Sequence, residues 1–514
     1  MNSSSDQDPV FSFLGDTRRF PEVRRIDTHA ASVFLAGDRA LKVKRAIRLP
    51  FLDYSTLAQR KAACLKEMEV NRPFAPDIYR GVVAITLTPE GSFAIDGSGT
   101  PVEYAVEMRR FDDDQTLDHL GCRHHLPPDL GERLAEAIAA SHQAATCPSS
   151  NEWIECLSTW IDAFAASFRA GGRFDPTEID ELRSACHAAL ARLRPLLEQR
   201  VRAGDVKRCH GDLHLANIVL IDGKPVLFDA IEFDDRIATV DVLYDLAFPL
   251  MDLLHVEETA AANHVLNRYL AIASPDQTDG LAALPLFMAM RAAIRAQVFL
   301  AKLDRDASEH ASPGPSANFE VAKSYFQLAK ELIRPVAPMM IAVGGLSGTG
   351  KSALSRALAP HLAPPPGAIV LRSDVLRKRL FGIKDTERLP AAAYTPQSSA
   401  TVYQALATHA HRVLSHGFTV VVDAVFARAD ERNEIHALAK RLNLRFAGLF
   451  LIADLQVRQD RIQSRVGDAS DATVAVAKDQ ESYDIGALDW WQVDASGTPE
   501  ATLALALSRL SGKT

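Results

Sequence analysis

The sequence reads Gly345-Leu346-Ser347-Gly348-Thr349-Gly350-Lys351-Ser352 at the point that decides the fold of its second half, and this stretch matches G-x-x-x-x-G-K-[ST]. It follows an apolar run over 339–343 and precedes a stretch of helical periodicity over 353–362. Glycines let backbone N–H groups curl around phosphate oxygens, and the N-terminus of a helix adds a favourable dipole. The stretch therefore predicts a loop that binds the phosphates of ATP, between a strand and a helix.

Side chains in and beyond this loop supply the other groups that a phosphate site needs. Lys351 is predicted to meet the β- and γ-phosphates, and the hydroxyl of Ser352 to bind Mg²⁺. The apolar run over 418–422 ends in Asp423, a position suited to holding the same ion through water. The residues predicted to bind ATP in this loop are Gly345, Ser347, Gly348, Thr349, Gly350, Lys351 and Ser352.

A third apolar run, over 368–371, leads through Arg372 and Ser373 to Asp374. Residues just past the ends of parallel strands face the ligand crevice of such a sheet. Asp374 is therefore predicted to accept the proton of a substrate hydroxyl as a catalytic base. The alternative is a solvated cap of the helix predicted over 375–380.

A helix after the strand predicted over 447–452 carries Arg458, Arg461 and Arg465 on one face. Arginines at these positions are suited to close over phosphates as a lid, so Arg461 and Arg465 are predicted to bind ATP. A plain solvated face of the helix would have the same pattern.

The composition limits the compartment and the partners of the chain. With 514 residues and a formal charge of −8, the chain is long enough for several domains and has no general attraction to nucleic acid or anionic membranes. No apolar run approaches the ~18–20 residues that span a bilayer. The six cysteines form no CxxC pair, and Cys122 with its neighbouring histidines fits no common zinc pattern. We expect reduced thiols and a cytoplasmic protein.

The first half carries a second constellation, His210-Gly211-Asp212-Leu213-His214-Leu215-Ala216-Asn217. An apolar hairpin around Asp222-Gly223 and then Phe228-Asp229 follow it. Phosphoryl transfer of the protein-kinase type needs a base Asp, an Asn that binds Mg²⁺ and a second metal-binding Asp after a hairpin. Asp212, Asn217 and Asp229 supply these three groups in that order.

The pattern around this constellation predicts a two-lobed α+β domain. Residues 28–110 have the alternation of strands and hairpins with one helix over 54–71, and residues 129–200 and 240–333 are largely helical in pattern. The helical pattern ends at the prolines at 335 and 338, just before the strand that leads to the phosphate loop. We therefore predict a kinase-like domain over 1–335 and an α/β domain with a parallel sheet over 336–514.

The motif H-G-D-x-H-x-x-N resembles the aminoglycoside phosphotransferase and choline kinase superfamily. The resemblance implies that Asp212 is the base, that Asn217 and Asp229 hold metal, and that Asp245 braces the catalytic loop. Upstream, the stretch 40–43 resembles the strand that carries the ATP-phosphate lysine. This makes Lys42 that lysine and Glu67 its ion-pair partner, with Lys44 and Glu69 as alternatives to each. No GxGxxG occurs near 28–32.

Residues 339–514 resemble the small P-loop kinases that include gluconate kinases, chloramphenicol phosphotransferases, zeta toxins and polynucleotide 5′-kinases. The pair Asp374-x-x-Arg377 is similar to the polynucleotide kinase pattern, in which the Asp is the base and the Arg grips the substrate's phosphate. Val420-Val421-Val422-Asp423-Ala424, followed by Arg428 and Arg432, continues that likeness. Arg377 is therefore the predicted substrate-binding residue.

The whole chain resembles bacterial fusions of an aminoglycoside phosphotransferase-like domain with a P-loop kinase-like domain. The resemblance implies a kinase that uses ATP and Mg²⁺ at two nucleotide sites and phosphorylates a hydroxyl of a small molecule. One alternative is a polynucleotide 5′-hydroxyl kinase in the second domain, which the basic run 377–379 favours and the acidic net charge disfavours. The other alternative is that one domain binds ATP only to regulate its neighbour.

Overall fold

The computed structural model describes residues 7–28, 30–49, 52–147, 152–309, 317–384, 387–464 and 469–511. The chain divides into two compact units, Met1–Trp160 with Arg194–Asp252, and Ile161–Leu193 with Leu253–Thr514. The boundary predicted between residues 335 and 336 lies inside the second unit and stays a prediction.

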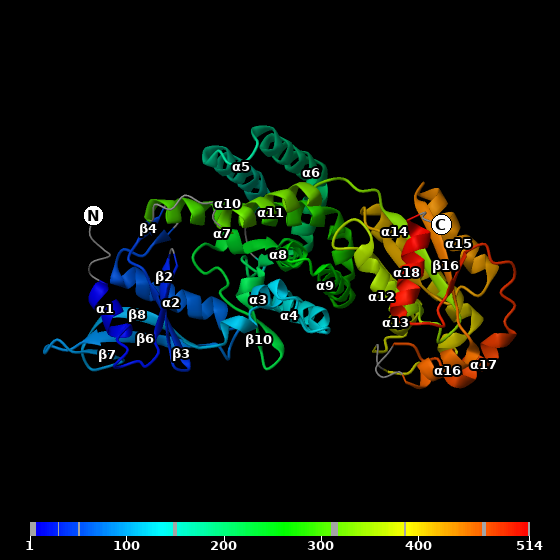
Figure 1. The fold of residues 1–514 in the computed structure, drawn as a ribbon, viewed down its shortest axis with the longest axis horizontal. Helices are drawn as coiled ribbons and strands as arrows, with labels where there is room; N and C mark the ends of the chain where they lie inside the picture. The colour runs from blue at the N-terminus through cyan, green and yellow to red at the C-terminus, as the bar shows by residue number, and fades with distance from the viewer. Residues whose placement is uncertain are drawn as a thin grey trace. The chain divides into compact units, whose positions relative to one another are not determined.

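The first unit contains an antiparallel sheet of six strands in the order β1-β2-β3-β8-β6-β7, drawn in blue shades in Figure 1. A hairpin around Gly37-Asp38, within the region predicted to hold strands and hairpins, joins β2 to β3, and Gly37 takes a φ of 59°, which favours glycine. The strands are β1 Arg24–Asp27, β2 Ala31–Ala36, β3 Arg39–Lys44, β6 Tyr79–Leu87, β7 Phe93–Ile95 and β8 Thr100–Arg109.

Helix α2, Leu57–Asn71, packs on this sheet and carries Glu67 on its buried side. The helix begins three residues after the predicted start because Thr56 caps it: Thr56 Oγ1 accepts a hydrogen bond from Gln59 N in a capping box. Cys64 and Met68 pack in one hydrophobic cluster with residues of β6 and β8. The helical pattern of α2 therefore fixes which face carries Glu67.

The predicted hairpin of the first unit consists of β10, Ile218–Ile221, and β11, Lys224–Leu227. Asp222 and Gly223 form its turn, both with positive φ, as a two-residue hairpin turn requires. Helix α4, Leu130–Ala144, packs on β11. The other elements of this unit are α1 Asp8–Leu14, β4 Arg48–Leu49, β5 Leu52–Asp53, α3 Leu117–Cys122, β9 Val206–Arg208, α7 Asp235–Ala238 and β12 Thr239–Asp241.

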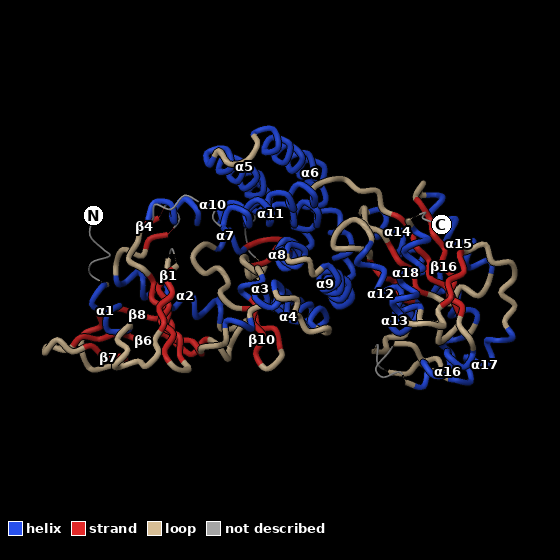
Figure 2. The backbone as a smooth tube through the Cα atoms, in the orientation of Figure 1, coloured by secondary structure: helices blue, strands red, loops and turns tan. Residues whose placement is uncertain are grey.

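The second unit contains a sheet of five parallel strands in the order β14-β15-β13-β16-β17, which confirms the predicted α/β fold. Figure 2 shows these strands in red between helices in blue. The strands are β13 Met339–Gly345, β14 Ile369–Arg372, β15 Val420–Asp423, β16 Arg445–Ile452 and β17 Trp491–Asp494. Four of them lie within two residues of the predicted runs at each end, and β17 was not predicted.

Both faces of the parallel sheet are buried, and one hydrophobic cluster covers the face that carries Ile341 and Val343. Ile341 and Val343 of β13 pack against Leu354 and Leu358 of α12 and Ala506 of α18. The helices that contact the sheet strands include α12 Lys351–Leu358, α13 Ser373–Leu380, α14 Pro396–Ser415, α15 Ala429–Arg441 and α18 Pro499–Leu510, and α16 Leu455–Gln463 and α17 Val474–Asp479 follow β16.

The second unit also includes helices that precede the predicted boundary. Helix α9, Thr259–Ile272, has side-chain contacts with the edge of the parallel sheet. The 3₁₀ segment η3, Pro275–Ala283, contacts helix α14, where Arg412 donates to Asp279. The long helices are α5 Trp153–Gly171, α6 Pro176–Ala203, α8 Val242–His255, α10 Leu284–Glu309 and α11 Ala317–Leu332, of which α5, α6 and α8 each cross from one unit to the other along the chain.

One helical stretch is an exception to the expectation that nothing here could span a membrane. Asp276–Asp304 has the length and a mean hydropathy of 1.4 that a span needs, but 67% of its apolar window is buried inside the protein. The core helix of a soluble protein has the same properties.

Candidate active sites

The predicted catalytic loop of the first unit is braced by two buried carboxylates of α8. Asp245 Oδ1 accepts a hydrogen bond from Gly211 N at 2.8 Å, and Asp245 Oδ2 accepts one from His210 N at 3.3 Å. Asp252 Oδ2 accepts a third, from Leu215 N, at 3.0 Å. The brace that the resemblance implies for Asp245 is present, and Asp252 is a second one that the sequence reasoning did not single out.

The structure brings Asp212 and Asn217 together. Asn217 Nδ2 donates to the backbone oxygen of Asp212 at 2.9 Å and to its carboxylate Oδ2 at 3.3 Å. His214 Nε2 lies 3.4 Å from the same carboxylate oxygen. The side chain of Asp212 is 41% exposed, so an acceptor molecule can reach it from solvent. The side-chain oxygens of both residues are suited to bind Mg²⁺ or to accept a hydrogen bond from the hydroxyl of an acceptor molecule.

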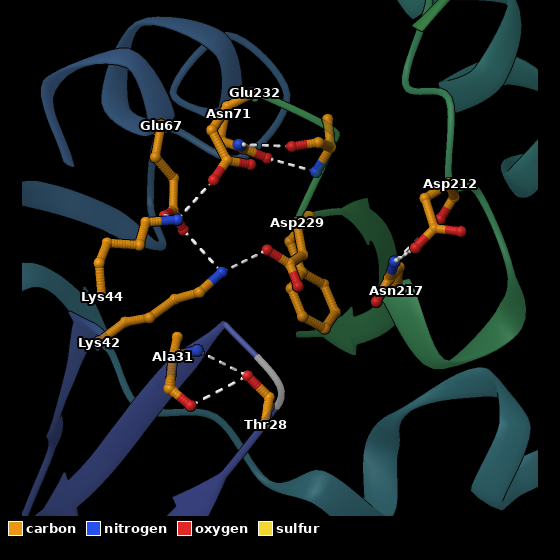
Figure 3. Close-up of polar contacts among 12 residues, drawn as sticks. Thr28, Ala31, Lys42, Lys44, Glu67, Asn71, Asp212, Asn217, Asp229 and Glu232 are labelled. Carbon is orange, nitrogen blue, oxygen red and sulfur yellow. Dashed lines mark hydrogen bonds and ion pairs between the residues drawn. The ribbon is translucent and has the colours of Figure 1, made fainter. Parts of the chain in front are cut away.

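Asp229, the predicted second metal ligand, follows the hairpin with a φ of 61°. Its backbone N–H donates to Tyr79 Oη at 3.1 Å. The next residue, Ala230, is held on both backbone groups by Asn71, whose Nδ2 donates to Ala230 O at 3.1 Å and whose Oδ1 accepts from Ala230 N at 2.6 Å. These contacts fix the backbone of Asp229, and Figure 3 shows its carboxylate pointing toward Lys42.

A network of buried charges connects this segment to the sheet. Glu67 Oε1 lies 2.8 Å from Lys42 Nζ, and Glu67 Oε2 lies 2.6 Å from Lys44 Nζ. Lys42 Nζ also lies 2.5 Å from Asp229 Oδ1, and Lys44 pairs with Glu232. Of the predicted alternatives, Lys44 reaches the same carboxylate as Lys42. Glu69 is wrong as the partner, because it is exposed and pairs with Lys66 on its own helix.

The electrostatics of this network follow from its burial. Burial opposes ionisation of Glu67, but the charges of Lys42 and Lys44 outweigh it and lower the pKa of Glu67 to about 2. Burial likewise opposes the charge on both lysines, and their carboxylate neighbours nevertheless raise the pKa of each above its usual value. Glu67, Lys42 and Lys44 are therefore ionised at neutral pH.

In the second unit the phosphate loop and the strand end at Asp423 meet as predicted. Ser352 Oγ donates to Asp423 Oδ2 at 2.6 Å, and Arg372 Nε lies 3.5 Å from the same oxygen. Lys351 Nζ donates to Leu346 O at 3.2 Å and so closes the loop on itself. Hydroxyl and carboxylate oxygens are ligands that Mg²⁺ accepts, so Ser352 and Asp423 fit the predicted metal site.

The loop depends on glycine at Gly348, where a Cβ would lie 2.6 Å from Arg458 O. Arg458 is buried, and its Nε donates to Ser347 O at 2.9 Å, so this arginine supports the loop from behind and is not part of a lid. Arg461 Nη1 donates to Thr349 O at 3.4 Å, and its side chain lines the cavity in front of the loop. Arg465 lies outside the described residues.

A cavity of about 1590 Å³ in the second unit is lined by Lys351, Ser352, Asp374 and Arg377. Helix α13 begins at Ser373, so Asp374 lies in its first turn. The predicted start at residue 375, which would place Asp374 before the helix, is two residues too late. Burial raises the pKa of Asp374 above its usual value, and the negative charge of Asp423 raises it further. A carboxylate that gains a proton readily in a cavity beside a phosphate loop is suited to act as a base.

The basic run 377–379 is engaged within the protein. Arg377 is buried, with Nη1 donating to Ala393 O at 2.5 Å, while its Nε has no hydrogen-bond partner among the residues that the structure describes. Lys378 is buried beside Asp471 at 3.3 Å, and Arg379 donates to Ala271 O at 2.8 Å.

Of the two further arginines in the likeness, Arg428 forms an exposed pair with Asp430. Arg432 is buried and donates to four backbone carbonyls, those of Phe426, Ala427, Ile485 and Ala487. Arg432 therefore stabilises the segment after β15.

Several site residues could not be found from motifs. Glu232 belongs to the charge network of the first unit, and Asn71 holds the backbone of Ala230 beside Asp229. Gln480 Oε1 accepts a hydrogen bond from Ser347 N in the phosphate loop at 2.7 Å. The one available signal was the spacing of Glu232, three residues after Asp229 and so close to a predicted metal ligand.

Known proteins match both halves of the chain. Residues 96–283 match the sequence model of the phosphotransferase enzyme family, and residues 340–483 match that of an AAA domain. An uncharacterised protein of Mycobacterium tuberculosis (strain ATCC 25618 / H37Rv) is 29% identical over 506 residues, which are 95% of each chain. The two family matches confirm the resemblance predicted for each half.

Solved structures also resemble each half. A choline/ethanolamine kinase family protein from Mesorhizobium loti is 16% identical with a TM-score of 0.40, covering 64% of this chain and 95% of that one. A gluconokinase from Sinorhizobium meliloti 1021 is 22% identical with a TM-score of 0.26, covering 35% of this chain and 94% of that one.

Proposed function

We propose that this chain, which is a kinase, has two separate ATP sites. Residues 96–283 belong to the phosphotransferase enzyme family, and residues 340–483 belong to the AAA domain family. At each site the γ-phosphate of ATP is transferred, with Mg²⁺, to a hydroxyl of a small molecule. The two sites lie in different compact units, and each has its own base.

One observation carries the proposal. A single cavity of the second unit is lined by Lys351, Ser352 and Asp374, and Ser352 contacts Asp423 at 2.6 Å. In this site Lys351 and Arg461 bind phosphate oxygens, and Asp374 accepts the proton of the attacking hydroxyl. Mg²⁺ bound at Ser352 and Asp423 would neutralise charge on the phosphates.

The first unit supports a second site of the same chemistry. Lys42 binds phosphate oxygens while Glu67 holds its ammonium group in place, and Asn217 and Asp229 are the oxygen ligands for metal. Asp212 accepts the proton of the acceptor hydroxyl. Positioning and charge neutralisation supply most of the rate in such sites, since the protein forms no covalent bond to phosphate.

Two features favour a small acceptor over a nucleic acid at the second site. Arg377, Lys378 and Arg379 are each engaged with groups of the protein, so they present no continuous basic surface. The net charge of −8 would also repel a polyanion. The orphaned Nε of buried Arg377 remains suited to one oxygen of a small acceptor.

The test screens candidate acceptors for phosphorylation by labelled ATP. The acceptors are sugars, amino alcohols, aminoglycosides and 5′-hydroxyl oligonucleotides. The full chain is compared with Asp212→Asn, Asp374→Asn and the double variant. We expect each single variant to lose one phosphorylated product and keep the other. Loss of both products from one single variant, with the other substitution neutral, would mean that one domain is a regulator.

The cytoplasm is the proposed location. None of the six cysteines, all of which lie in the described part of the chain, forms a disulfide, which suits a reducing compartment. Fractionation of the source cells with an antibody against the chain checks this, and recovery outside the cytoplasmic fraction would contradict it.

A further inference from the structure

Strand β3 presents two lysines to one carboxylate. Lys42 and Lys44 are two residues apart, so they lie on the same face of the strand while Val43 between them is buried on the other. Both ammonium groups reach Glu67, one at each carboxylate oxygen, at 2.8 and 2.6 Å. Figure 3 shows the ammonium groups of both side chains reaching Glu67.

The two lysines differ in their second partner and in their exposure. Lys42 pairs with Asp229, whose side chain is 41% exposed, whereas Lys44 pairs with Glu232, whose side chain is 7% exposed. The Lys44 side chain itself is 3% exposed. Lys42 and Asp229 therefore form the open end of the network, which a ligand can reach. Lys44 and Glu232 form its closed end.

The charges of Lys44 and Glu232 compensate for a contact that is lost when Lys42 binds phosphate. Lys42 and Asp229 neutralise each other in this structure, and both must leave that contact if Lys42 is to bind phosphate and Asp229 is to bind metal. Glu67 is fully buried and would then depend for compensation on its other partner. A buried carboxylate without a nearby cation is costly and tends to gain a proton.

From the geometry we infer that Lys44 and Glu232 are positioning residues for the ATP site of the first unit. They form a permanent buried ion pair that keeps Glu67 ionised and in place. Meanwhile Lys42 leaves Asp229 to bind the phosphates, and Asp229 leaves Lys42 to bind Mg²⁺. Asn71 supports the arrangement, because its two hydrogen bonds to Ala230 fix the backbone between Asp229 and Glu232. This inference rests on the proposed function of the site.

The inference assigns different tasks to two neighbouring lysines. If Lys44 were instead the phosphate lysine, it would have to leave Glu232 in the closed part of the network. If the deeper pair only stabilised the fold, its removal would change the free energy of unfolding and leave turnover per folded molecule unchanged.

The experiment uses the full chain with Lys351→Ala, which silences the second site. The probes are Mg·ATP, titrated calorimetrically, and hydrolysis of ATP with water as the acceptor. The main variant is Lys44→Met with Glu232→Gln, which removes both charges and leaves neither of them orphaned. The matched control is Lys66→Met with Glu69→Gln, which removes an exposed Lys–Glu pair of α2, the helix that carries Glu67.

We expect the Lys44/Glu232 variant to melt cooperatively and to lose at least about tenfold in kcat, because Lys42 is no longer held for the phosphates. The control variant should match the parent, and Lys44→Arg should restore most of the rate. Parental kcat and Mg·ATP affinity in the Lys44/Glu232 variant would overturn the inference. The inference would also be overturned if Lys42→Met kept ATP hydrolysis and Lys44→Met lost it.

Two further variants keep the test decisive. If the double variant fails to fold, Glu232→Asp retains the charge but shortens the side chain. A several-fold loss of kcat would then support the positioning role, and a parental rate would overturn it. Asp212→Asn separates the inference from its premise: if that variant hydrolyses ATP and phosphorylates every acceptor at the parental rate, the proposed function of the site fails.

Discussion

The side-chain amide of Asn267 pairs with Val370 in the way that a neighbouring strand would. Val370 N donates to Asn267 Oδ1 at 2.8 Å, and Asn267 Nδ2 donates to Ala368 O at 3.1 Å. Ala368 immediately precedes β14, the edge strand of the parallel sheet, and β14 leads directly to Asp374. A helix that precedes the predicted boundary therefore satisfies the open edge of the strand that carries the proposed base.

This pairing predicts that Asn267→Ala destabilises the second unit. The substitution leaves the N–H of Val370 without its acceptor, which costs about 1–3 kcal/mol in the free energy of unfolding. Urea denaturation of the full chain, followed by tryptophan fluorescence, to which Trp490 and Trp491 of the second unit contribute, measures the loss. Asn433→Ala, on the exposed face of α15, is the matched control and should change nothing. Equal stability of the two variants would contradict the assigned contact.

Lys351→Ala should remove ATP turnover by the second unit while leaving its fold intact. The lysine charge acts on negative charge that develops on the phosphates, so we expect a loss of about 10²–10³-fold in kcat. Hydrolysis of ATP by the full chain carrying Asp212→Asn isolates this activity. Lys440→Ala, an exposed lysine of α15, is the control. A parental rate with Lys351→Ala would rule out the role of this lysine.

Asp374→Asn should abolish phosphorylation at the second site and yet stabilise the protein at neutral pH. Burial raises the pKa of Asp374 in the folded state, so the folded protein holds this proton more tightly than the unfolded chain does. Stability therefore falls as the pH rises from the usual aspartate range through the raised pKa, and the full cost is present at neutral pH. The amide carries no such cost.

Thermal melts of Asp374→Asn and the parent between pH 4 and 8, without nucleotide, test this. We expect a higher Tm for the variant at pH 8 and a narrower difference between the two Tm values at pH 4, close to the usual aspartate range. An unchanged difference across this range, or a less stable variant at pH 8, would contradict the sign. In the same range, the acid limb of kcat at this site should lie above that of an ordinary aspartate.

Asp212→Asn and Asp229→Asn should affect the first site in different ways. A base acts on the acceptor, so Asp212→Asn lowers kcat by about 10²–10⁴-fold with little change in ATP affinity. Asp229→Asn removes a proposed metal ligand, so it weakens binding of Mg·ATP and shifts the dependence on Mg²⁺ concentration. Calorimetric titration at several Mg²⁺ concentrations, in the Lys351→Ala background, separates the two. Identical profiles for the two variants would refute the division of roles.

Local patterns predicted the parts of this protein that depend on spacing along the chain. The turn at Asp222-Gly223, the loop that ends at Ser352 and the strand that ends at Asp423 all follow from residues a few positions apart. Alternatives stayed open where neighbouring positions share one pattern. Glu67 and Glu69 both suited a helix partner for Lys42, and only the packing of α2 on the sheet shows that Glu67 faces inward. Arg458 and Arg461 share a helix face in sequence, but Arg458 is buried behind the phosphate loop.

The two kinase-type folds and the principal candidates for base, lysine and metal ligands could be predicted from sequence, because these residues lie in short motifs whose spacing the chemistry requires. The further residues that support them could be identified only from the folded chain. Lys44 meets Glu232 across 188 positions of the chain, and Asn267 meets Val370 across 103. The physical reason is that a buried charge or an open strand edge needs a partner in space, and no local pattern along the chain specifies where that partner comes from.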